Sequence, residues 1–166
     1  MQIGRREFLK YCIGSAAALG LDLSVLGRLE KALAAGGPNV IWLSGASCTG
    51  CTVSLANLFS SQAPTDVSDL LINHIDLMFH PNLMGAAGDT AVTNLKTAID
   101  APFVMAVEGG IPTAFNGNTC WLWTEGGHDV TAQEAVAQIS ANSNLLAILS
   151  IGTCASFGGI PAGNPN

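Results

Sequence analysis

The chain has 166 residues, enough for one domain, and 49% of them are hydrophobic while only 11% are charged. Five of the six basic residues lie in the first 31 positions, and beyond them only Lys96 stands against nine acidic residues. This acidic body excludes nucleic acid as a partner, because phosphate binding requires lysine and arginine side chains. Five cysteines in such an apolar chain do not indicate a disulfide-stabilised mini-protein.

Residues 1–34 have the pattern of an export signal. The segment starts with a basic pair, continues with an apolar stretch and closes on small residues, at Arg5-Arg6, 11–26 and Ala32-Leu33-Ala34. The apolar stretch is interrupted by Asp22 and is shorter than the ~20 residues that a membrane-spanning helix needs. We therefore expect a twin-arginine signal peptide that is removed together with Cys12. The protein is then periplasmic, with membrane association on the periplasmic side left open.

From residue 35 onward, short apolar runs alternate with segments of helical periodicity. The predicted strands are residues 39–43, 70–75, 102–107 and 145–151. The predicted helices are residues 52–60, 82–99 and 130–141, with a surface loop over residues 115–129. Apolar strands that alternate with helices indicate a parallel sheet covered on both faces. We therefore predict an α/β domain over residues 35–166 with a doubly wound parallel sheet, whose ligand crevice lies beyond the carboxyl ends of the strands.

Glycine-rich loops follow three of the predicted strands, at residues 44–51, 108–113 and 152–159. In the predicted topology these loops share one end of the sheet, so three cysteines that are distant in sequence converge there, namely Cys48, Cys51 and Cys154. A Cys-x-x-Cys motif at a helix start can place two thiolates on one metal centre, and glycines bring backbone N–H groups close to an anion. Iron–sulphur clusters are usually held by four cysteine thiolates, of which these loops supply three.

Other chemistries fit the same residues. A lone Cys-x-x-Cys motif is also typical of a thioredoxin-like redox pair, and Cys154 can be an ordinary buried thiol. Glycine-rich loops at strand ends can hold a flavin phosphate, and zinc can use the same thiolates, although no second Cys-x-x-Cys motif or nearby histidine supports it. Absorption spectroscopy separates the main cases, because a cluster gives a broad shoulder, a flavin gives two resolved bands and a cluster-free scaffold gives neither.

Four stretches occur in the order of a known family, at residues 47–51, 79–81 with 84–88, 107–113 and 152–159. Together they resemble the small subunit of nickel–iron hydrogenases, and the resemblance covers nearly the whole chain. It implies a flavodoxin-like domain with a proximal 4Fe–4S cluster. It also implies a heterodimer, in which the large subunit holds the nickel–iron site and oxidises dihydrogen while the small subunit carries the electrons away.

The resemblance also implies roles for individual residues. Cys48, Cys51 and Cys154 match three ligands of the proximal cluster. Glu108 matches an acidic residue near the subunit interface, although a solvated loop carboxylate is the alternative interpretation. The positions expected to form the environment of the cluster are Thr49, Gly50 and Thr153.

Two features depart from the common family pattern. Val53 stands where the family commonly has glutamate, and with Cys120 this resembles a sub-branch that includes nickel–iron–selenium enzymes. We expect Cys120 to be a structural thiol and not a ligand. In the family, the fourth proximal ligand and the later cluster ligands lie beyond the position that matches Asn166, so we expect a sheet that is incomplete at the C-terminus.

Three expectations follow from that second departure. The fourth ligand is absent from this chain, and a second polypeptide could carry the missing cluster domain. An alternative is a truncated, cluster-free protein that serves interaction or assembly. A flavin-binding module of flavodoxin type is the remaining alternative.

Overall fold

The computed structural model describes residues 37–163, so the predicted signal peptide over residues 1–34 lies outside the described residues. The strands are β1 (Asn39–Ser44), β2 (Asp76–Phe79), β3 (Phe103–Glu108), β4 (Trp121–Glu125), β5 (His128–Thr131) and β6 (Leu145–Ile151). The α-helices are α3 (Gly50–Ala56), α4 (Val67–Asn73), α5 (Gly88–Ala98), α6 (Ala132–Ser140) and α7 (Gly152–Phe157). Two short 3-10 helices are η1 (Ala114–Gly117) and η2 (Ile160–Ala162).

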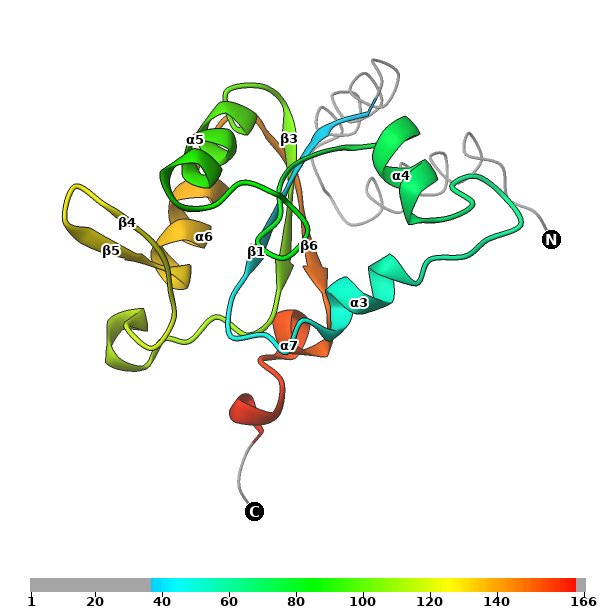
Figure 1. Cartoon of the computed structure of the whole chain (residues 1–166). Helices are drawn as coiled ribbons and strands as arrows, with labels where there is room; N and C mark the ends of the chain where they lie inside the picture. The colour runs from blue at the N-terminus through cyan, green and yellow to red at the C-terminus, as the bar shows by residue number, and fades with distance from the viewer. Residues whose placement is uncertain (1–36, 164–166) are drawn as a thin grey trace, which may run out of the picture.

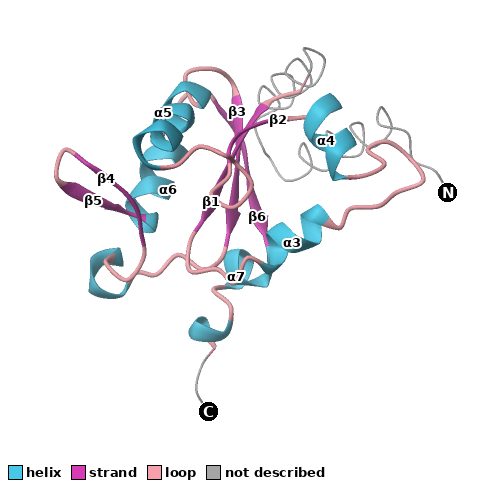
Figure 2. Ribbon diagram, viewed as in Figure 1, coloured by secondary structure: helices cyan, strands magenta, loops and turns pink. Residues whose placement is uncertain are grey.

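Four parallel strands form the central sheet in the order β2-β1-β3-β6 (Figures 1 and 2). This is the beginning of the strand order found in flavodoxin-like sheets. Helices α5 and α6 lie on one side of the sheet and α4 lies on the other (Figure 1). The predicted α/β class with a parallel sheet is therefore confirmed.

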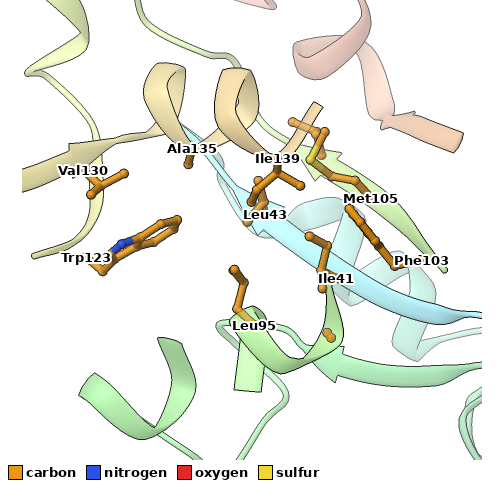
Figure 3. Packing of buried hydrophobic residues seen from close by; sticks show 11 residues of the cluster. Ile41, Leu43, Leu95, Phe103, Met105, Trp123, Val130, Ala135 and Ile139 are labelled. Carbon is orange, nitrogen blue, oxygen red and sulfur yellow. The ribbon is translucent and has the colours of Figure 1, made fainter. Parts of the chain in front are cut away.

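The main hydrophobic core lies between the sheet and helices α5 and α6 (Figure 3). Strands β1 and β3 contribute Ile41, Leu43, Phe103 and Met105, and the two helices contribute Leu95, Ala98, Ala135 and Ile139. All six residues of the central strand β3 are buried, as expected for a strand whose two faces are both covered. Burying these side chains fixes the ends of β1 and β3 and so gives the following loops a rigid base.

The predicted strand over residues 70–75 is wrong. Residues 67–73 form helix α4, and the strand β2 begins only at Asp76. Asp66 caps the helix by accepting a hydrogen bond from the backbone N–H of Asp69 at 2.9 Å. The run Leu70-Leu71-Ile72 is too short for its period to separate a helix from a strand, so the cap decides the structure.

The predicted surface loop over residues 115–129 is also wrong, because most of it forms the antiparallel hairpin β4–β5. The two strands are joined by Gly126-Gly127, with φ values of 58° and 81°. A pair of glycines with positive φ is the preferred turn of a tight hairpin, and this signal in the sequence was missed.

Two helix boundaries also differ from the sequence-based expectation. Helix α5 begins at Gly88, whereas the predicted helix begins at residue 82. The intervening chain turns at His80, whose carbonyl accepts a hydrogen bond from the N–H of Met84 at 3.1 Å. Helix α3 ends at Ala56, whereas the predicted helix runs to residue 60. The glycine-rich segment after β6 contains the short helix α7, and the other predicted strands and helices are confirmed with small shifts of their ends.

Candidate metal centre

The register of the sheet brings three loops to one edge. Ser44 at the end of β1 pairs with Glu108 at the end of β3, and Glu108 pairs with Ile151 at the end of β6. The loops after these strands therefore start at the same level of the sheet, as Figure 1 shows below β1, β3 and β6. The predicted arrangement of the three glycine-rich segments is present in the structure.

The three cysteines of these segments lie close together. Cys51 begins the first turn of α3 and Cys154 lies in α7, while Cys48 precedes α3 and is exposed. The Sγ atom of Cys51 lies 3.7 Å from the carbonyl oxygen of Ile151, so α3 and the end of β6 are in contact. Burial raises the pKa of the Cys51 thiol, and the proximity of Glu108, Cys48 and Cys154 raises it further. Cys51 thus lies near both of the other cysteines.

Glycines make room for these sulphur atoms. A Cβ atom on Gly152 would lie 2.5 Å from the Sγ of Cys51, and one on Gly159 would lie 2.8 Å from the Sγ of Cys154. Both glycines have a positive φ, at 79° and 66°, which other residues rarely adopt. These positions therefore require glycine twice over, for the backbone conformation and for the space that the sulphur atoms occupy.

Within residues 37–163, no three histidine, cysteine, aspartate or glutamate side chains meet in a geometry that would hold a single metal ion. An iron–sulphur cluster differs from a single ion, because its thiolates bind different iron atoms. Three thiols are donors of the type that iron–sulphur clusters use, and their chemistry fits three ligands of a cluster.

Glu108 is a buried carboxylate with four hydrogen-bond donors, and its side chain is 1% exposed. Its Oε1 accepts hydrogen bonds from the backbone N–H groups of Cys51 at 3.1 Å and Thr52 at 3.3 Å. Its Oε2 accepts from the Trp42 indole at 2.9 Å and from the Thr52 hydroxyl. Burial alone would raise the pKa of Glu108, but the donors from Thr52, Trp42 and Cys51 hold it below its ordinary value. The alternative of a solvated loop carboxylate is excluded.

Sequence reasoning missed three residues of this network. Thr52 is 4% exposed, and its hydroxyl lies 3.4 Å from the Nε2 of His80. His80 is fully buried, and its ring centroid lies 5.0 Å from that of Trp42. Trp42 and His80 are far from Glu108 in sequence, so no spacing rule could have joined them. The signals available were a polar residue directly after Cys51 and a histidine at the end of an apolar run.

The remaining predicted site residues lie on the surface of the same edge. Thr49 is exposed between the two cysteines of the Cys-x-x-Cys motif and has a φ of 62°, which is unusual for a β-branched residue. A Cβ atom on Gly50 would lie 3.2 Å from the Sγ of Cys48, and Thr153 is exposed in α7. Cys120 instead lies directly before β4, and its backbone carbonyl accepts a hydrogen bond from the N–H of Ala132, the first residue of α6.

The two largest of three described cavities lie beside the sheet, and the third, of about 230 Å³, is lined by His80 and its neighbours. One of about 360 Å³ lies beside Cys154 and is lined by Ala46, Ile111 and Pro112 among others. The other, of about 410 Å³, lies between the start of α5 and strand β4, and none of the predicted site residues lines it. The chemistry of the cysteines therefore belongs to the strand-end edge and not to the larger cavity.

Comparison with known proteins shows the family of this chain. Residues 48–166 match the family described as NADH ubiquinone oxidoreductase, 20 Kd subunit. The chain belongs to this family. The match begins at Cys48, so it includes all three candidate cysteines and the second and third loops of the candidate metal centre.

Curated relatives of this family member are small subunits of hydrogenases. The periplasmic nickel–iron–selenium hydrogenase small subunit of Desulfomicrobium baculatum is 35% identical, over 100% of this chain and 54% of the relative. The quinone-reactive nickel–iron hydrogenase small chain of Wolinella succinogenes is 39% identical, over 99% of this chain and 45% of the relative. The chain thus spans about half the length of these relatives, and the resemblance found in its sequence is confirmed.

Solved structures agree with this result. The nickel–iron–selenium hydrogenase of Desulfomicrobium baculatum, in a reduced, active form, superposes with a TM-score of 0.70 at 34% identity. That match covers 78% of this chain and 47% of the other. The corresponding enzyme of Desulfovibrio vulgaris Hildenborough gives a TM-score of 0.69 at 34% identity, over 76% of this chain and 44% of the other. Within residues 37–163, no helix is long and apolar enough to cross a membrane.

Proposed function

We propose that this chain forms the electron-transfer part of the small subunit of a periplasmic nickel–iron hydrogenase. In this proposal, Cys48, Cys51 and Cys154 supply three thiolates to a proximal 4Fe–4S cluster. The observation that carries the proposal is the placement of these thiols on loops that start at one edge of the sheet, beside glycines that leave room for sulphur. When bound, such a cluster accepts and releases one electron at a time.

The surrounding residues prepare the site for that role. Glu108 accepts the N–H groups of both Cys51 and Thr52, so it anchors the first turn of α3 and with it the Cys51 thiol. The same carboxylate keeps a negative charge beside the site, which favours the more oxidised form of a neighbouring cluster. Gly152 lets the start of α7 approach the Cys51 sulphur, and Gly159 lets the backbone after α7 approach the Cys154 sulphur. Thr49, Gly50 and Thr153 complete the exposed rim of this edge.

The partner proposed for this edge is the large subunit of the hydrogenase, which would hold the nickel–iron site and split dihydrogen. Three large apolar side chains near the edge are strongly exposed, namely Phe115, Phe157 and Ile160. Exposed apolar groups of this kind are typical of a protein–protein interface. The fourth thiolate of the cluster would come from sequence outside residues 37–163 or from a second polypeptide. We propose that residues 35–166 belong to this domain.

Iron content tests the proposed ligands. Cys48→Ser, Cys51→Ser and Cys154→Ser in the full protein, purified anaerobically with its partner, are expected to lose iron and sulphide relative to the wild type. Cys120→Ser is the matched control, because its thiol lies away from the site, and should keep the wild-type content. Equal iron content in all four variants, or a flavin spectrum in the wild type, would exclude the proposed site.

Export is tested separately. We propose that residues 1–34 are a twin-arginine signal peptide, so replacing Arg5 and Arg6 by lysine should leave the precursor in the cytoplasm. Immunoblots of cytoplasmic and periplasmic fractions measure this, with a Lys10→Arg variant as the control. Unchanged periplasmic accumulation of the double-lysine protein would contradict the proposed signal.

A further inference from the structure

A chain of hydrogen bonds connects His80 to Glu108 behind the candidate metal centre. The Nε2 atom of His80 lies 3.4 Å from the Thr52 hydroxyl, which is in turn hydrogen-bonded to Oε2 of Glu108. All three side chains are buried. None of the three matches a position expected to bind metal, yet Glu108 and Thr52 flank Cys51 directly.

The direction of this hydrogen-bond chain follows from the groups at its two ends. The backbone N–H of Asn82 donates to Nδ1 of His80 at 3.1 Å, so Nδ1 carries a lone pair and the proton sits on Nε2. The His80 Nε2–H then donates to the Thr52 oxygen, and the Thr52 O–H donates to the carboxylate, which can only accept. Every donor points toward Glu108, and hydrogen bonds aligned in this way strengthen one another.

The same contacts prevent His80 from passing a proton onward. Its Nδ1 is already engaged by a backbone N–H that cannot accept a proton, and the ring is enclosed with no exposed surface. Burial lowers the pKa of His80, and the charge of Glu108 opposes this only in part. The imidazole also stacks against Trp42, which is itself a donor to Glu108. The ring is thus held on three sides in one orientation.

We propose that His80 is a positioning residue, which acts through Thr52 to hold the Glu108 carboxylate in one orientation beside Cys51 and so sets the reduction potential of the bound cluster. The inference rests on the proposed function for the cluster, but the hydrogen-bond chain itself does not. Removing the Thr52 hydroxyl takes a donor from Glu108, and removing His80 leaves that hydroxyl without the partner that orients it, so in both cases the charge of the carboxylate is less well neutralised. The cluster should then be harder to reduce.

The first test uses the reduction potential of the assembled protein, measured by titration with electron paramagnetic resonance detection. Thr52→Val keeps the shape of threonine but lacks the hydroxyl, and His80→Phe keeps the stacked ring but lacks both nitrogens. Each should lower the midpoint potential, and the double variant should show no more than the larger single shift. Thr52→Ser, which retains the hydroxyl, should restore the wild-type potential. Potentials that stay unchanged, rise, or fall additively would overturn the proposal.

The second test does not depend on the cluster. Nitrogen-15 NMR of histidine-labelled, assembled protein should show His80 as the neutral tautomer protonated at Nε2, and Thr52→Val should move the Nε2 resonance. A tautomer protonated at Nδ1, or a charged ring, would overturn the hydrogen-bond chain. A protein without iron would contradict the proposed function instead, so the two failures are distinguishable.

Discussion

At the scale of single residues, the candidate centre depends on the absence of side chains as much as on the cysteines. Gly152 and Gly159 each sit where a Cβ atom would overlap a cysteine sulphur. Each also has a backbone conformation that costs roughly 1–2 kcal/mol for a residue with a Cβ atom. A methyl group at either position must therefore displace a thiol.

Gly152→Ala tests this dependence. The added Cβ atom would lie 2.5 Å from the Sγ of Cys51, so we expect loss of most of the iron and a destabilisation of at least about 1 kcal/mol. Iron content and chemical denaturation of the purified complex measure the two effects. Gly85→Ala is the matched control, because nothing lies within 4 Å of its Cβ position. Full iron occupancy in Gly152→Ala would show that the sulphur atoms do not need this space.

The residues of the centre were only partly predictable from the sequence. The Cys-x-x-Cys motif and the strand-end loops predict that Cys48, Cys51 and Cys154 lie at one edge of the sheet, because the loops that follow parallel strands start at the same edge. The burial of Glu108 was not predictable, since its donors come from Trp42 of the neighbouring strand β1 and from Thr52 of helix α3. Such pairings depend on which strands are neighbours, and no local pattern encodes them.

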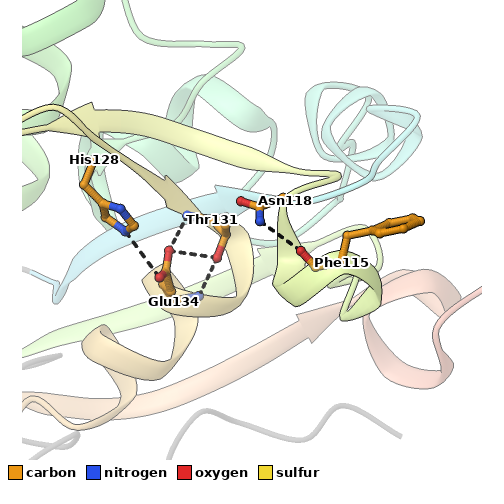
Figure 4. A network of polar contacts seen from close by, with 5 residues as sticks. All are labelled: Phe115, Asn118, His128, Thr131 and Glu134. Carbon is orange, nitrogen blue, oxygen red and sulfur yellow. Dashed lines mark hydrogen bonds and ion pairs between the residues drawn. The ribbon is translucent and has the colours of Figure 1, made fainter.

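At the scale of elements, the start of helix α6 shows how strongly a local signal can define a boundary (Figure 4). The Thr131 hydroxyl accepts a hydrogen bond from the N–H of Glu134 at 3.1 Å. In return, the Glu134 carboxylate accepts from the N–H of Thr131 at 2.9 Å, which completes a capping box. The hydrogen bonds from Thr131 lower the pKa of Glu134.

This cap predicts a dependence of stability on pH. Because the pKa of Glu134 is lower in the folded state than its ordinary value of about 4.3, the ionised cap stabilises the protein above that pH. The contribution is lost as the pH falls through the lowered pKa. Glu134→Gln keeps an acceptor but cannot titrate, so it should remove this part of the pH dependence.

The measurement is the difference in unfolding free energy between wild type and Glu134→Gln, taken from about pH 6 down to about pH 3. His128 lies 3.3 Å from the Glu134 carboxylate, so both proteins should carry His128→Ala to eliminate its charge. The difference should shrink as the pH falls. A difference that stays constant across this range would contradict the proposed contribution of the cap.

The elements that sequence reasoning predicted wrongly are those whose apolar runs are short. Residues 70–75 contain three apolar residues in succession, and the Asp66 cap turned that region into a helix. The sequence pattern predicts a loop in place of the hairpin β4–β5, because strands of five and four residues are too short to give a clear period. The Gly-Gly turn is the signal that indicates the hairpin. Strand β3 was predictable because it is a continuous apolar run, and helix α6 because its apolar residues recur with the helical period.

At the scale of the whole molecule, the buried and exposed apolar groups are unevenly distributed. The core between the sheet and helices α5 and α6 is closed, whereas Ile148 and Leu149 of β6 are 47% and 48% exposed. Among the described residues, β6 pairs only with β3, so its other edge is free. An unpaired apolar edge strand favours association, which agrees with a domain that functions inside a larger assembly.

The most direct test of an electron-carrying role is the response of the assembled complex to dihydrogen. Under anaerobic conditions, dihydrogen should bleach the broad visible absorption of the wild-type complex and produce the paramagnetic resonance signal of a reduced cluster. Cys51→Ser should weaken both responses, while Cys120→Ser should leave them intact. The contradicting result is a complex that oxidises dihydrogen with an artificial acceptor at its partner subunit while the cluster bound by this chain stays oxidised. In that case the chain does not carry the electrons.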